Sequence, residues 1–72
     1  MSFQAYLDNI AAKTGKSADD LKTLAIGKGL ADAKGLAPGV KATAIIDWLK
    51  RDFDLGHGHA MSIVAYIKGK RS

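Results

Sequence analysis

Residues 55–70 read LGHGHAMSIVAYIKGK, and the apolar side chains in this stretch recur at steps of three and four. This spacing predicts a helix with one buried face, formed by Ala60, Ile63, Val64 and Ile67. Its β-branched residues are tolerated because burial outweighs their weak helix propensity. The alternating LGHGH before the run is either a bend or a ligand site.

The preceding segment, KATAIIDWLKRDFDL at residues 41–55, has the same helical period. Ile45, Trp48, Leu49 and Phe53 share one face, so this segment predicts a second amphipathic helix. Trp48 is expected to contribute most to the core because of its size.

Two further helices are predicted nearer the start of the chain. In SFQAYLDNIAAKTG, residues 2–15, Ser2 can cap the first helix and Gly15 supplies a left-handed stop. Its apolar stripe is Phe3, Tyr6, Leu7, Ile10 and Ala11.

The second of these helices follows Ser17, where Asp19 and Asp20 favour the positive end of the helix dipole. It should end near Gly27 and Gly29. Its predicted stripe is Leu21, Leu24 and Ala25.

Residues 30–40, LADAKGLAPGV, favour a loop or one short helical turn, with a turn at Pro38. No segment alternates as a half-buried strand does. With four helices, short connections and 72 residues, we expect an all-α protein, a compact bundle in which residues 1–72 form one domain.

Composition favours a soluble cytoplasmic chain with no membrane partner. Eleven Lys and Arg against seven acidic residues give a net charge of +4, and cysteine is absent. The charge is no larger than solubility favours, and the missing cysteines fit a reducing compartment. No apolar run approaches the ~18 to 20 residues that a membrane span requires.

The structural interpretation of LGHGH makes Asp54–His59 a turn between two helices, because glycines permit tight turns. The alternative is an anion cradle, in which Gly56 and Gly58 let backbone N–H groups approach a phosphate at a helix N-terminus. The spacing of these glycines is that of a helix-hairpin-helix, although His57 stands where that motif usually has an aliphatic residue.

An anion or nucleic acid held at this turn would also meet basic side chains that precede it. The candidate binding residues are Lys50, Arg51, Gly56, His57, Gly58 and His59.

A metal site at the two histidines would need a third ligand such as Asp52 or Asp54, so no metal or other cofactor is predicted. His59 and Ser62 lack the partner and pocket that a catalytic pair needs. Ser62 should instead bond to its own helix backbone. No catalytic residue is assigned, and the chain is not expected to be an enzyme.

Two other features have ordinary structural explanations. Tyr6 lies on an apolar stripe and should belong to the core, whereas the role of Tyr66 is open. The basic tail KGKRS at residues 68–72 should be solvated, and it complements the dipole of the last helix.

The segments at residues 2–21, 41–50 and 55–67 resemble a bacterial family known only as a domain of unknown function. The most specific elements are T-G-K-S at 14–17, W-L-K at 48–50 and L-G-H-G-H-A at 55–60. Residues 30–40 match least. The resemblance implies a short intracellular helical protein, in some members followed by a further domain, and it implies no activity, cofactor or substrate.

These features together favour a small non-enzymatic protein-interaction or accessory module, with a protein partner or self-association. For a protein partner, an exposed apolar patch of a few hundred Å² is expected. The alternative is a nucleic-acid or phosphate-binding module that uses the Gly56–His59 turn.

Overall fold

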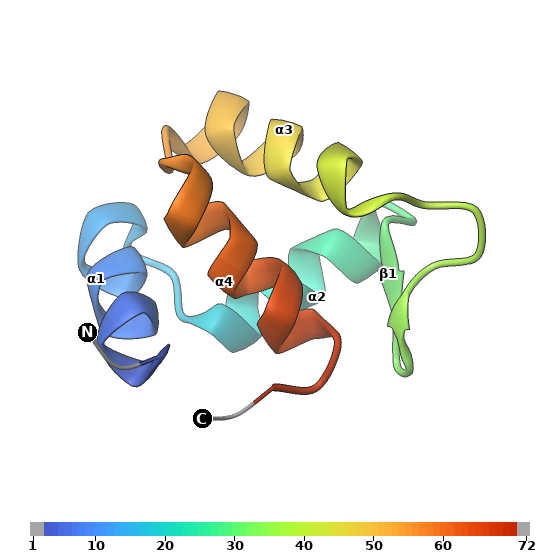
Figure 1. The fold of residues 1–72 in the computed structure, drawn as a ribbon, viewed down its shortest axis with the longest axis horizontal. Helices are drawn as coiled ribbons and strands as arrows, with labels where there is room; N and C mark the ends of the chain where they lie inside the picture. Colours follow the sequence, from blue (N-terminus) through green and yellow to red (C-terminus); the bar gives the residue numbers. More distant parts are fainter. Residues whose placement is uncertain (1–2, 71–72) are drawn as a thin grey trace.

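Helix α4, His57–Ile67, lies in the middle of the molecule, with α1, Phe3–Thr14, α2, Ala18–Gly27, and α3, Ala42–Phe53, around it (Figure 1). The computed structural model describes residues 3–70. A short antiparallel hairpin of β1, Ala31–Asp32, and β2, Gly35–Leu36, joins α2 to α3. The four predicted helices and the all-α class are confirmed.

Most of the circumference of α4 is buried, because the helix packs against each of the other three. The predicted face is confirmed, since Ala60, Ile63, Val64 and Ile67 are all in the core. Ser62 and Tyr66 are also buried. A narrow strip containing His57, Met61 and Lys68 stays exposed.

Helix α3 lays the predicted apolar face against α4. Ile45, Trp48 and Leu49 are buried, and Phe53 is half-buried with its ring edge-on to that of Trp48 at 5.7 Å. Lys28, the C-cap of α2, places its ammonium 5.8 Å from the centre of the Trp48 ring. Trp48 is therefore a core residue, as its size predicts.

The ends of α1 and α2 follow the signals in the sequence. Gly15 has a φ of +73°, the left-handed stop expected after α1. The Ser17 hydroxyl accepts from the Asp20 amide, and the Asp20 carboxylate accepts from the Ser17 amide, which forms a capping box. The predicted stripe of α2 is wrong at Leu24, whose side chain is 38% exposed. Ser2 lies outside the described residues.

The hairpin was not predicted, because strands of two residues are too short to show alternation. The Asp32 carboxylate accepts from the amides of Lys34 and Gly35 at 2.8 and 3.1 Å, and so holds the tight turn. The predicted turn at Pro38 is present: the Val40 amide donates to the Ala37 carbonyl at 3.0 Å, and Gly39 supplies a φ of +79°.

The connection between α3 and α4 is shorter than predicted. The left-handed residue is Asp54, with a φ of 54°, while Gly56 has an extended backbone and serves as the N-cap of α4. The Asp54–His59 turn is therefore wrong in its bounds, because His57, Gly58 and His59 form the first turn of the helix. The two glycines are not needed for left-handed geometry.

No helix within residues 3–70 is both long enough and apolar enough to cross a membrane.

The central position of α4 predicts that its core side chains dominate stability. Ile63 is fully buried, so Ile63→Ala should lower the free energy of unfolding by about 2–5 kcal/mol and Ile63→Val by about 0.5–1.5 kcal/mol. Met61, which lies on the exposed strip and is 44% exposed, is the control, and Met61→Ala should change the free energy of unfolding by about 0.5 kcal/mol or less. Urea unfolding followed by circular dichroism measures all three, and equal losses at Ile63 and Met61 would contradict this placement.

Candidate functional site

The LGHGH stretch forms an uncapped helix start. Gly56 is the N-cap and has no side chain to bond the amides of the first turn. A Cβ built at Gly56 or Gly58 would meet nothing within 4 Å. The amides of His57, Gly58 and His59 precede the first amide that bonds within the helix, which is that of Ala60 to the Gly56 carbonyl at 2.9 Å.

The two histidines have different surroundings. His57 is exposed, whereas His59 is half-buried with its ring edge-on to the Tyr6 ring, at 5.4 Å between centroids. His59 therefore ties the start of α4 to α1. Among residues 3–70, no group of three or more His, Cys, Asp or Glu side chains lies close enough to hold a metal ion.

The basic members of the predicted site lie on the preceding helix. Lys50 and Arg51 are exposed in the last turn of α3, where cations complement the negative end of that helix's dipole. The Arg51 guanidinium lies 3.4 Å from the Asp52 carboxylate. Of the predicted site residues, Gly56–His59 therefore lie together at the N-terminus of α4, whereas Lys50 and Arg51 lie on the surface of α3.

Ser62 serves its own helix. Its hydroxyl donates to the Gly58 carbonyl at 3.0 Å, which confirms the bond to the backbone predicted for it. The bond satisfies a hydroxyl that is only 9% exposed.

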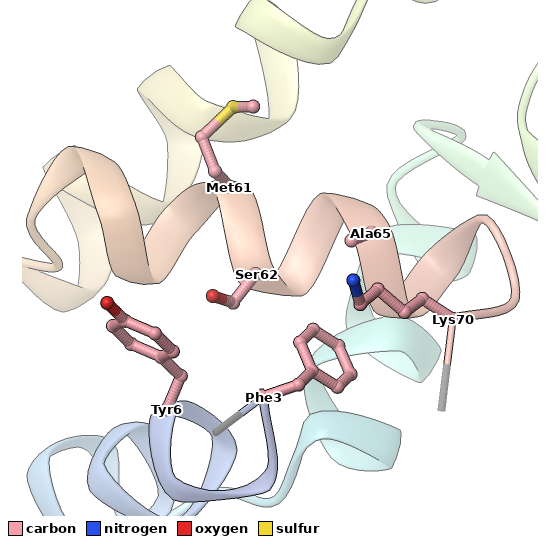
Figure 2. A pocket seen from close by; sticks show the side chains of 6 residues that line it. All are labelled: Phe3, Tyr6, Met61, Ser62, Ala65 and Lys70. Atoms are coloured by element: carbon pink, nitrogen blue, oxygen red, sulfur yellow. The ribbon is translucent and has the colours of Figure 1, made fainter. Parts of the chain in front are cut away.

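A shallow hollow of about 290 Å³ opens between α1 and α4, and it was not predicted from the sequence. Figure 2 shows the Phe3 and Tyr6 rings rising from α1 toward α4, with Ser62 facing them. The Lys70 ammonium reaches back over the Phe3 ring, 5.3 Å from its centre. We call this the α1–α4 hollow; its lining residues are Phe3, Tyr6, Met61, Ser62, Ala65 and Lys70.

The two tyrosines differ in burial: Tyr6, which was assigned to the core, is the more exposed one, and Tyr66, whose role was left open, is buried. Tyr6 is half-buried and lines the α1–α4 hollow, so its assignment to the core is wrong. Tyr66 is 9% exposed, and its hydroxyl donates to the carboxylate of Asp19. The long reach of Tyr66 from α4 to α2 explains the difference, because no local spacing in the sequence reveals a partner on another helix.

A second hollow of about 200 Å³ lies on another face of α1 and is acidic. Asp8 and Asp19 line it together with Tyr66. The Asp8 carboxylate also accepts from the Gln4 amide group at 2.9 Å. The two hollows therefore differ in charge.

The described part of the basic tail, residues 68–70, is exposed as predicted. Lys70 is exposed, yet its ammonium lies against the Phe3 ring. Arg71 and Ser72, the rest of the tail, lie outside the described residues.

The fold and its surface define a small all-α domain with shallow hollows beside its central helix. The chain belongs to the family described as Domain of unknown function (DUF4287), which matches residues 2–69. This confirms the resemblance to a domain-of-unknown-function family. No curated protein and no solved structure matches the chain.

The helical setting of Gly58 makes a direct prediction. Because a Cβ there meets open space, Gly58→Ala should raise the free energy of unfolding by about 0.5–1 kcal/mol through the lower backbone entropy of the unfolded chain. Gly15→Ala is the matched control: space is equally open, but the φ of +73° should make alanine destabilising by about 1 kcal/mol. Thermal unfolding of both variants measures the contrast, and a destabilised Gly58→Ala would place the start of α4 elsewhere.

Proposed function

We propose that this chain is a small non-enzymatic interaction module of the cytoplasm, and that it binds a protein partner through the α1–α4 hollow. The observation that carries the proposal is an open hollow lined by two aromatic rings and bordered by a methionine that is 44% exposed. The absence of cysteine supports the cytoplasmic location.

The side chains around the hollow are of the types that protein interfaces favour. Aromatic residues and methionine are enriched in interfaces, and methionine adapts its shape to a partner. Phe3 and Tyr6 are half-buried, and their contacts with Lys70 and His59 respectively restrict the motion of the two rings. A surface organised in this way loses less conformational entropy on binding.

The interface proposed here is small. Among the described residues, three large apolar side chains are exposed, those of Leu24, Ile26 and Met61. They provide less exposed apolar surface than the patch that the sequence analysis expected. A small contact of this kind suits a transient partner that inserts a side chain rather than an obligate one. The proposal therefore rests on the hollow and not on a flat apolar surface.

A photocrosslinking residue tests this use of the surface. With p-benzoylphenylalanine in place of Met61, irradiation of living cells should give a discrete protein adduct, and the same residue in place of Asp47, exposed on α3, should not. Ala65→Gln, which fills the floor of the hollow, should remove the adduct. Mass spectrometry of the adduct separates a partner protein from a second copy of this chain, which would be self-association.

Equal adduct yields at positions 61 and 47, or no adduct at position 61, would contradict an interface at the α1–α4 hollow.

The uncapped start of α4 favours a second candidate function, phosphate or nucleic-acid binding. Free amides and a positive dipole end attract anions, and His57 and Gly58 leave this end open to solvent. Lys50 and Arg51 would add positive charge from α3. This function would use a different part of α4 from the hollow.

Salt dependence separates the two functions. Binding to a fluorescent DNA duplex or single-stranded RNA through phosphate contacts should weaken steeply as salt rises, because counterions are released. The expected result under the interaction proposal is no measurable binding of either probe even at low salt. Salt-sensitive binding that is lost on Lys50→Gln and Arg51→Gln substitution would favour the second candidate.

A further inference from the structure

The α1–α4 hollow has one charged side chain in its lining, that of Lys70, which favours a partner of opposite charge. We infer that the hollow receives a short acidic segment of a partner protein, with an apolar side chain between the Phe3 and Tyr6 rings and helix α4 and a neighbouring carboxylate beside Lys70. This inference rests on the proposed function, and it adds the class of segment that is bound.

The two hollows that border α1 carry opposite charges. Lys70 is the one charged side chain among the six residues that line the α1–α4 hollow. The second hollow is lined by Asp8 and Asp19 and contains no basic residue in its lining. A carboxylate is attracted to the α1–α4 hollow and repelled by the second hollow, so an acidic segment would bind in the α1–α4 hollow.

The apolar part of the α1–α4 hollow has a defined shape. The Phe3 and Tyr6 rings on α1 face Ser62 on α4, while the Met61 side chain points away from the two rings and lines only the rim (Figure 2). The His59 ring contacts the Tyr6 ring, which limits how far the Tyr6 ring moves. The hollow is shallow and open, with a volume of about 290 Å³, so a leucine or phenylalanine side chain would lie against the two rings without being enclosed.

The ammonium of Lys70 is positioned at one end of this apolar space. It lies 5.3 Å from the centre of the Phe3 ring, close enough for the ring face to attract it. A carboxylate that follows the inserted apolar residue would pair with the same ammonium. Because Lys70 is exposed, the pair should raise affinity by only about two- to fivefold.

Lys68 provides a matched control for this role. It is exposed near the same end of α4 but does not line the hollow. Lys68→Met and Lys70→Met remove the same charge from the whole protein, so they separate a local contact from the general attraction of a chain with net charge +4.

The test uses three capped peptides of equal length with a central leucine-phenylalanine pair. The pair is flanked on both sides by aspartates, asparagines or lysines. Each peptide is titrated into the ¹⁵N-labelled full chain, and the amide shifts give both the location and the affinity. We expect shifts at Phe3, Tyr6, Met61 and Ala65, an affinity about two- to fivefold higher for the aspartate than the asparagine peptide, and the weakest binding for the lysine peptide.

The variants complete the test. Lys70→Met should remove the difference between the aspartate and asparagine peptides, and Lys68→Met should keep it. Loss of the difference in both variants would show that net charge alone acts, which overturns the role of Lys70. Equal binding of all three peptides at the hollow would overturn the acidic preference and leave the proposed interface standing. If none of the peptides shifts any amide, the inference that the hollow binds a short peptide segment is wrong. The crosslinking experiment at position 61 tests separately whether the hollow is a protein interface.

Discussion

The burial of α4 among the other three helices is the constraint on which this structure depends. Ala60, Ile63 and Ile67 are fully or almost fully buried, and α4 is the helix that packs against each of the others. In a chain this short, the apolar surface removed from water around one central helix is a large share of the total. The connections need only be short enough to bring α1, α2 and α3 against it.

The same packing creates the surface that we assign to binding. Because the other helices pack around α4, its exposed residues are His57, Gly58 and Met61, which lie along one strip with Lys68 just beyond the helix, and His59 and Ala65 are half-buried. The α1–α4 hollow lies along the edge of this strip, between residues that meet only in the folded chain. Ser62 shows how closely core and surface adjoin, since it is buried, bonds to the Gly58 carbonyl and still lines the hollow.

The helical spacing of apolar residues was enough to predict all four helices and most of the core. Local signals also located the ends, as at the Ser17 cap and the Gly15 stop. The hairpin of β1 and β2 was missed because it depends on two paired residues on each strand and on the Asp32 side chain. Tyr6 was misjudged and Tyr66 was left open because their positions depend on contacts between helices, with His59 and Asp19 respectively. The hollow was missed for the same reason.

Native-state amide hydrogen exchange measures the dependence on α4 most directly. If this helix holds the domain together, its central amides, from Ile63 to Ile67, should exchange only by global unfolding, with protection equal to the full stability of the chain. The ends of α1 and α2 should exchange through smaller local openings. Rapid exchange in the centre of α4 while α1, α2 and α3 remain protected would contradict the account, because the other helices would then be stable without the helix that they surround.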